Sequence, residues 1–162
     1  MDRSLSVSWS DPRMLSEAAR AMAGIEFLQA IRDGRLPSPP IAQLLGMRLA
    51  EVERGHAVFE VVPAEQYYNP IGVVHGGLAL TLLDSAMACS IQTHLPAGTG
   101  YTTLEVKVNF VRAITSTTGR LRAIGKIVHA GNRVATAEGR VEDAAGKLYA
   151  HGTTTCMVLS GG

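Results

Sequence analysis

The 162-residue sequence has no excess of charge of one sign, since 15 Lys and Arg residues stand against 14 Asp and Glu residues. A protein dedicated to nucleic acid normally carries a strongly positive surface, so a net charge of +1 argues against that role. Low-complexity sequence is scarce, and 46% of the residues are hydrophobic, which is too many for a disordered chain. The length fits one globular domain with a sizeable core.

Features of export and of membrane insertion are also missing. The first 14 residues contain no apolar stretch of signal-peptide length. Residues 85–104 carry no formal charge, but polar residues, a proline and two glycines interrupt them, which excludes a membrane span. Cysteine is rare, and Cys89 and Cys156 lie far apart without metal-ligand spacing. This pattern favours reduced, buried thiols in a cytoplasmic protein.

Residues 1–39 are expected to form an N-terminal extension to the main domain, residues 40–162. Apolar side chains recur at helical intervals over residues 14–33, which predicts one amphipathic helix that ends at Gly34. Residues 35–40 contain three prolines and predict a short, stiff connector. We expect the helix to pack on the main domain or on a partner subunit.

The main domain combines strand patterns with one long helix. Residues 47–62 predict two strands that turn at Arg54 and Gly55, and residues 75–93 predict a helix that is apolar on nearly all sides. Further strand patterns cover 102–110, 119–130, 133–143 and 147–158. In the first of these, one face is expected to hold Leu104, Val106, Val108 and Phe110. Short turns between the segments favour an α+β fold in which strands, ending in a meander of four, wrap one buried helix.

Asp84 is the anomaly of the apolar helix. It is the only acidic residue between Glu65 and Glu105, and no Lys or Arg lies between Arg54 and Lys107 to pair with it locally. Burying an unpaired carboxylate costs several kcal/mol. A structural carboxylate paired with distant chain and a carboxylate tuned for acid, base or nucleophile chemistry are both consistent with this position.

A second feature opens the same helix, where Gly76 and Gly77 follow His75. Free backbone N–H groups at a helix N-terminus can stabilise an oxyanion, although a plain turn explains the glycines equally well. A rise of about 1.5 Å per residue separates Gly76 from Asp84 by roughly 12 Å, too far for both to contact one carbonyl group. Two antiparallel copies of the helix across a two-fold axis would bring Asp84 of one chain beside Gly76 of the other.

The segment NPIGVVHGGLALTLLDSAMA resembles the hotdog-fold acyl-CoA thioesterases of the phenylacetate-degradation type, and the likeness extends over residues 40–158. It implies a curved antiparallel sheet around a long central helix, with the N-terminal helix as an addition. It also implies an acyl-CoA substrate, no cofactor or metal, a homodimer that completes the site, and a further pairing into a homotetramer. Neither nucleic acid nor a membrane is an implied partner.

The resemblance also assigns roles to individual residues. Asp84 matches the catalytic carboxylate, either as nucleophile or as general base, and Gly76 matches the backbone N–H that polarises the thioester carbonyl. Asn69 matches a position that holds the water or the thioester, and His75 matches a positioning histidine. Thr103, or Thr102 if the preceding loop differs in length, matches a hydroxyl that binds the water.

Substrate-binding residues fall into two groups. One group is expected to lie near the thioester and to line the acyl pocket: Gly77 at the helix start, and Leu80, Leu83, Met87 and Ala88 around Asp84. The N-terminal helix is expected to contribute to the wall of this pocket. Residues 107–140 contain seven basic residues and one acidic residue. This local positive charge suits the phosphates of coenzyme A, although solvated strand-edge charges explain the pattern equally well. The candidate phosphate contacts are Arg112, Gly131, Asn132 and Arg133.

Other reaction classes are poorly represented. The sequence has no GxSxG, HExxH or Walker motif, and its five histidines lack metal-ligand spacing. Two alternatives stay open, a hotdog-type enoyl-CoA hydratase or dehydratase and a non-catalytic acyl-CoA-binding module. The segment from Tyr68 to Ile71 is similar to a hydratase signature but lacks its flanking residues. A sensor would need a DNA-binding segment, and the N-terminal helix with its Pro-rich connector is not expected to supply one. Thioester hydrolysis needs only an activated oxygen nucleophile and oxyanion stabilisation, which Asp84 and the Gly76 amide can supply.

Overall fold

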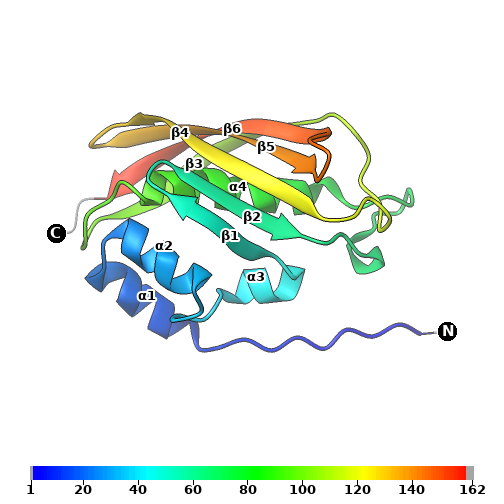
Figure 1. Ribbon diagram of the computed structural model, residues 1–162, viewed down its shortest axis with the longest axis horizontal. Coiled ribbons are helices and arrows are strands. Elements are labelled where there is room, and N and C mark those ends of the chain that lie inside the picture. Colours follow the sequence, from blue (N-terminus) through cyan, green and yellow to red (C-terminus); the bar gives the residue numbers. More distant parts are fainter. Residues whose placement is uncertain (1, 160–162) are drawn as a thin grey trace.

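A computed structural model describes residues 2–159 and shows one antiparallel sheet wrapped around the helix α4 (Gly76–Gln92) (Figure 1). The strand order is β1-β2-β4-β5-β6-β3. The strands span β1 (Arg48–Glu53), β2 (His56–Val61), β3 (Gly100–Phe110), β4 (Leu121–Ala130), β5 (Val134–Asp143) and β6 (Leu148–Leu159). The predicted α+β class, the central helix and all six strand regions are confirmed.

The predicted meander of four strands is wrong in one pairing. β4, β5 and β6 follow one another in the sheet, but β3 pairs with β6 at the far edge, and β4 pairs with β2. The cause is the loop 111–120, which is long enough to carry the chain from the β3 edge back to the middle of the sheet. β3 is consequently an edge strand.

A row of three glycines crosses the sheet, and two of them, Gly125 and Gly139, allow the sheet to approach α4 closely. Gly125, Gly139 and Gly152 are in register across β4, β5 and β6. A Cβ atom on Gly125 would lie 2.1 Å from the Ala86 carbonyl oxygen, so no side chain fits there. On either side of this row the core is filled by completely buried side chains of α4, Leu82, Leu83 and Met87.

Residues 2–39 of the N-terminal extension form two helices, α1 (Pro12–Ala21) and α2 (Gly24–Arg32), and α3 (Pro40–Leu45) follows at the start of the main domain. The prediction of one helix over 14–33 is therefore wrong, because the backbone is extended at Met22 and Ala23. The Gly24 amide donates to the Leu95 carbonyl (2.9 Å), and its Cα packs so tightly on Gln92 that a Cβ would lie 1.8 Å from the carbonyl oxygen. This docking overrides the helical period.

The extension lies beside β1 and the C-terminal end of α4 (Figure 1). Part of the predicted connector is helical, because Pro40 occupies the first turn of α3, where its fixed φ is tolerated. The expected packing on the main domain is confirmed. The extension meets the end of α4 that is opposite to Gly76.

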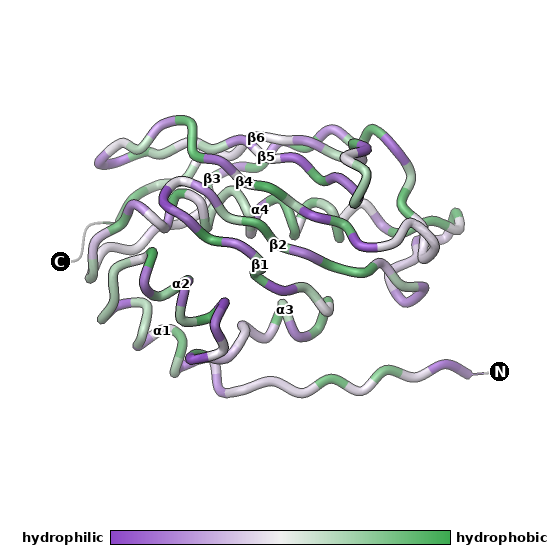
Figure 2. The backbone as a smooth tube through the Cα atoms, in the orientation of Figure 1, coloured by the Kyte–Doolittle hydropathy of each residue, from purple (hydrophilic) through white to green (hydrophobic). Residues whose placement is uncertain are grey.

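One face of α4 is open, so the prediction of a helix buried on all sides needs correction. The helix is hydrophobic along most of its length (Figure 2). Leu80 is nevertheless 39% exposed, and Thr81, Asp84 and Ser85 are half-buried. Their spacing places them on one face. None of the helices among residues 2–159 is long and apolar enough to cross a membrane.

Candidate active site

Asp84 lies on the open face of α4 and is held by β3. The Thr103 hydroxyl donates a hydrogen bond to Asp84 Oδ1 at 3.0 Å. None of the ion pairs between residues 2 and 159 involves Asp84, so a hydroxyl and not a cation is its neighbour. A half-buried carboxylate with one donor keeps its second oxygen available for a substrate or water.

A β-bulge makes this contact possible. Thr103 pairs with Cys156 and Glu105 pairs with Thr155, so Leu104 is an extra residue in β3. The bulge reverses which residues face α4. Thr103 faces the helix before the bulge and Val106 after it, whereas Leu104 is 53% exposed. The predicted face of Leu104, Val106, Val108 and Phe110 is therefore broken at Leu104, and Thr103 rather than the exposed Thr102 reaches Asp84.

A cluster of weakly acidic groups lies beyond Thr103. The Thr103 hydroxyl is also 3.8 Å from Cys156 Sγ, and the Tyr101 hydroxyl donates to Gln92 Oε1 at 3.4 Å. Burial, with the Asp84 charge as a second cause, raises the pKa of Cys89 to about 12. Burial also raises the pKa of Tyr101. These thiol and phenol groups are therefore protonated at neutral pH.

The N-terminus of α4 presents the Gly76 amide. His75 is the N-cap residue, and its Nδ1 accepts a hydrogen bond from the Gly77 N–H at 2.8 Å. The Gly77 N–H is thus occupied within the chain, whereas the Gly76 N–H has no acceptor among residues 2–159. Because Nδ1 is the acceptor, a neutral His75 ring presents Nε2–H as a donor. The ring of Phe110, which is 59% exposed, lies against Gly76.

Asn69 shapes the loop before α4. Its side-chain oxygen accepts hydrogen bonds from the amides of Ile71 (3.1 Å) and Val73 (3.3 Å). The oxygen is therefore used to close the loop, and the side-chain NH₂ is the group that remains for a substrate. The loop is anchored further by the His75 amide, which donates to the Tyr67 carbonyl at 2.7 Å.

A cavity of ≈ 590 Å³ at this end of α4, here called the Gly76 pocket, joins several of the predicted residues. Arg112 is the one Lys or Arg residue in its wall. The pocket is lined by Asn69, Val73, Val74, His75, Gly76, Gly77, Ala79, Leu80, Phe110, Val111, Arg112, Ala113, Ile114 and Tyr149. Asp84 lies outside this wall, so one chain does not bring Asp84 and Gly76 together.

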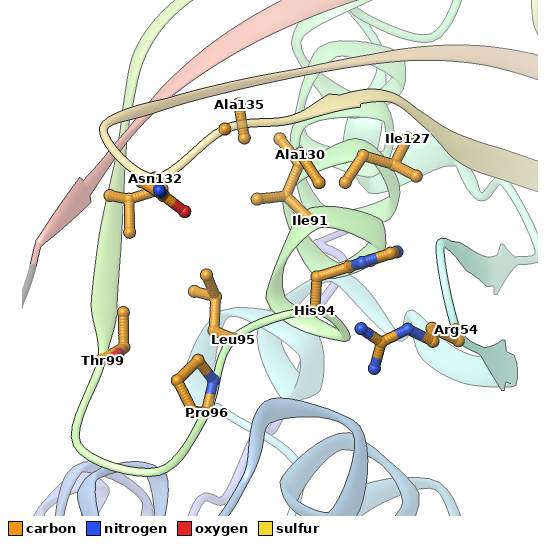
Figure 3. Close-up of a pocket in the computed structure, with 12 residues that line it drawn as sticks. Arg54, Ile91, His94, Leu95, Pro96, Thr99, Ile127, Ala130, Asn132 and Ala135 are labelled. Carbon is orange, nitrogen blue, oxygen red and sulfur yellow. The ribbon is translucent and has the colours of Figure 1, made fainter.

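The predicted turn of Gly131 and Asn132 lies at the opposite end of α4. Both residues line a second cavity, of ≈ 360 Å³, with Arg54 and His94. Figure 3 shows Arg54 and His94 on one side of this cavity and Asn132 on the other. Arg133 is exposed and does not line it. Within one chain, Arg112 and the 131–133 turn therefore contact different cavities.

Three of the predicted acyl-contact residues belong to the core. Leu83 and Met87 are completely buried, and both approach Gly139 of β5. Ala88 is also buried. The reason is the helical period, which turns these three positions away from the open face. Among the predicted substrate contacts on α4, Gly77 and Leu80 line the Gly76 pocket.

The two aromatic residues of the pocket were not anticipated from the sequence. Phe110 and Tyr149 come from β3 and β6, and only the fold places them beside the start of α4. For Phe110, the one signal in the sequence was an aromatic residue at the end of an alternating strand. No group of three or more His, Cys, Asp or Glu side chains among residues 2–159 is arranged to hold a metal ion.

Comparison with known proteins places this geometry in context. Residues 71–150 match the family model of the thioesterase superfamily. A protein of Archaeoglobus fulgidus named as an esterase is 29% identical over 125 residues, which cover 77% of this chain and 79% of the relative. The 1,4-dihydroxy-2-naphthoyl-CoA hydrolase of Listeria monocytogenes is 23% identical over 118 residues, 73% of this chain and 94% of the relative.

Solved structures agree with the sequence matches. A phenylacetic acid degradation-related protein of Ralstonia eutropha superimposes with a TM-score of 0.72 and 29% identity. The superposition covers 80% of this chain and 98% of that protein. The fold expected from the sequence resemblance is thereby confirmed.

Proposed function

We propose that the chain is a thioester hydrolase of the thioesterase superfamily that cleaves aryl- or medium-chain acyl-CoA to the free acid and coenzyme A. The CoA thioester named for the Listeria relative supports this substrate class. So does the likeness to a protein related to phenylacetic acid degradation. No cofactor takes part in the proposed reaction.

The observation that carries the proposal is Asp84, held by Thr103 on the open face of α4. Asp84 acts as nucleophile or as general base for water. An oxygen–carbon bond forms at the thioester carbonyl, and the carbon–sulfur bond breaks when the tetrahedral intermediate collapses. As general base, Asp84 takes a proton from the attacking water and passes it to the departing thiolate. As nucleophile, Asp84 forms a mixed anhydride as the thiolate leaves, and water then hydrolyses the anhydride to the free acid, its proton going to the thiolate. The Gly76 N–H, strengthened by the α4 dipole, stabilises the oxyanion.

The proposed site requires two chains. Asp84 and Gly76 are eight residues apart on one helix, and the Gly76 pocket does not include Asp84. Antiparallel pairing of two α4 helices would place each Asp84 beside the partner's Gly76, with Leu80 at the two-fold axis. The same pairing would bring Arg112 of one chain toward the 131–133 turn of the other. The exposed Leu80 and the open face of α4 support this homodimer.

Beyond the dimer, we place the chain in a cytoplasmic homotetramer. The free cysteines, Cys89 and Cys156, suit a reducing compartment. The tetramer follows from the sequence resemblance.

Release of free thiol from a panel of aryl, medium-chain and short-chain acyl-CoAs tests the activity. We expect hydrolysis of the aryl or medium-chain members and no hydration of crotonyl-CoA in a parallel assay. Absence of thiol release from every member would refute the proposed function. Crotonyl-CoA hydration would support the hydratase alternative, and tight acyl-CoA binding without turnover would support a binding module.

Mixing two inactive variants tests the shared site. Asp84→Asn removes the carboxylate, and Gly76→Pro removes one N–H at a position where helices accept proline. Gly76→Ala keeps the N–H and controls for the new Cβ beside Phe110. If chains mix at random, half of the dimers are mixed and each holds one intact site, so about a quarter of the wild-type activity should return. No recovery in a sample shown to contain mixed dimers would contradict the shared site.

A further inference from the structure

Arg112 is fixed at the Gly76 pocket by both its backbone and its side chain. The amides of Val111 and Arg112 donate to the Tyr149 carbonyl at 2.8 and 3.1 Å. Arg112 Nη1 donates to the Leu148 carbonyl at 2.6 Å, and the guanidinium carbon lies 6.0 Å from the centre of the Tyr149 ring. An exposed arginine normally samples many rotamers, so these contacts remove freedom that a flexible side chain would retain.

Tyr149 is itself held in place. Its ring is only 6% exposed, and its hydroxyl donates to Asp143 Oδ2 at 3.1 Å. The other carboxylate oxygen, Oδ1, accepts hydrogen bonds from the amides of Ala145 and Lys147 and closes the turn between β5 and β6. The order of contacts therefore runs from the turn through Asp143 and Tyr149 to Arg112.

The protonation states suit this arrangement. Hydrogen bonds from backbone amides, first that of Lys147, lower the pKa of Asp143 below its ordinary value. Burial, followed by the hydrogen bond to Asp143, raises the pKa of Tyr149. Asp143 is thus an anion and Tyr149 a neutral donor across the neutral pH range.

Arg112 has no carboxylate partner among residues 2–159, and Nη1 is the one nitrogen of its guanidinium with an acceptor there. The remaining N–H groups are available at a pocket that the N-terminus of α4 already makes favourable to anions. A guanidinium fixed in advance binds an anion with a smaller loss of conformational entropy.

We propose that Arg112 binds an anionic oxygen group of the substrate at the Gly76 pocket, and that Tyr149 and Asp143 are positioning residues for its guanidinium. This inference rests on the proposed thioester hydrolysis. The anionic group is a phosphate of the thiol carrier or a carboxylate on the acyl group, and the two sources can be separated experimentally.

The experiment compares matched thioesters that differ in one anionic group. Benzoyl-CoA and benzoyl-N-acetylcysteamine differ in the carrier phosphates, and glutaryl- and pentanoyl-N-acetylcysteamine differ in the acyl carboxylate. Within each pair, kcat/KM of the thioester that carries the anionic group is divided by kcat/KM of the one that lacks it. This ratio is measured for the unmodified protein, Arg112→Ala, Tyr149→Phe and Tyr149→Leu. Arg140→Ala is the matched control, because it removes an exposed positive charge that pairs with Glu142 outside the pocket.

We expect Arg112→Ala to lower one ratio about tenfold through KM, as loss of one charge-assisted contact predicts. A fall in the first pair identifies the phosphates, and a fall in the second identifies the acyl carboxylate. Tyr149→Phe keeps the ring but loses the Asp143 contact, so its fall should be smaller than that of Tyr149→Leu. Arg140→Ala should leave both ratios within about twofold, because its charge is remote and screened.

Each contrary result has a distinct meaning. Unchanged ratios in Arg112→Ala, with both thioesters of each pair hydrolysed, overturn the anion-binding role. Wild-type ratios in both Tyr149 variants, with a lowered ratio in Arg112→Ala, overturn the positioning role. Failure of the unmodified protein to hydrolyse any of the thioesters contradicts the proposed function instead.

Discussion

Thr103 Oγ1 lies 3.0 Å from Asp84 Oδ1 and donates a hydrogen bond to it. The contact fixes the orientation of a carboxylate that has no cationic partner among residues 2–159. Removing the donor should leave Asp84 present but less well oriented. A neighbouring hydroxyl and a neighbouring methyl group are therefore expected to have different effects on turnover.

Thr103→Val should lower kcat about tenfold, because it replaces the hydroxyl by a methyl group of nearly the same size. Thr103→Ser keeps the donor and should recover most of kcat. Thr102→Val, one residue earlier and exposed, is the control. Steady-state hydrolysis of the best acyl-CoA gives kcat for each variant, and equal loss in the Val and Ser variants would show that packing, not the hydrogen bond, is what matters.

The sequence predicted the facing of β3 incorrectly for a physical reason. Alternation of apolar residues places Leu104 with Val106, but the bulge adds one residue and reverses the pattern. Hydrophobic periodicity does not reveal a bulge, because a bulge is defined by how the strand pairs with its partner. Thr103 could therefore be proposed from family resemblance but not from the strand pattern.

Tertiary contacts explain the other differences. The apolar period over 14–33 is regular, yet docking of Gly24 onto the end of α4 divides the helix. The β3–β6 pairing joins segments that are about 50 residues apart in sequence, which local turn signals cannot reveal. By contrast, the helix start at His75–Gly76 and the position of Asp84 followed from local sequence and were located correctly.

Asp84→Asn should lower kcat by about a hundredfold or more, because it removes the nucleophile or base while keeping the shape of the side chain. Acyl-CoA affinity, measured by isothermal titration, should stay close to that of the unmodified protein. Ser85→Ala, at the next half-buried position on α4, serves as the control. Turnover near the wild-type level in Asp84→Asn would eliminate the proposed chemistry.

Leu80→Glu should dissociate the proposed dimer. Leu80 lies midway between Gly76 and Asp84, so antiparallel pairing places two copies of this residue face to face at the axis. Two carboxylates there would repel each other in a partly desolvated contact. Sedimentation velocity should show monomers, with activity lost in parallel. Ile71→Glu is the control, since Ile71 is 83% exposed in the loop before α4, and an unaffected dimer in Leu80→Glu would exclude this helix pairing.

Gly125→Ala should destabilise the fold by about 1–3 kcal/mol, the usual range for overpacking. Its new Cβ would lie 2.1 Å from the Ala86 carbonyl oxygen, so the sheet and α4 must move apart. In Gly100→Ala the nearest atom is Leu159 Cβ at 3.8 Å, which is ordinary contact, and this variant is the control. Urea unfolding gives the free energy of unfolding of both variants. Similar stability of the two variants would mean that the glycine row is not required for close packing.

The fold should lose stability as the pH falls through the normal titration range of histidine, and His94 should be responsible. Burial, with the nearby Arg54 charge as a second cause, lowers the pKa of His94 from its usual 6.5. His94 Nε2 is buried, has no hydrogen-bond partner in the described part of the chain and lies close to Gly55. The unfolded chain therefore binds a proton that the folded chain does not.

Protonation of His94 lowers the stability of the fold at acid pH. Above pH 6.5 both states hold a neutral His94, so its contribution is constant and fully present. As the pH falls below this value the unfolded state gains the proton first, and stability declines until the folded pKa is reached. Urea unfolding at pH 7.5 and pH 5.5 should show this decline, and His94→Gln should make it smaller. His129→Gln, in the exposed part of β4, is the control, and an equal decline in all three proteins would assign the pH dependence to other groups.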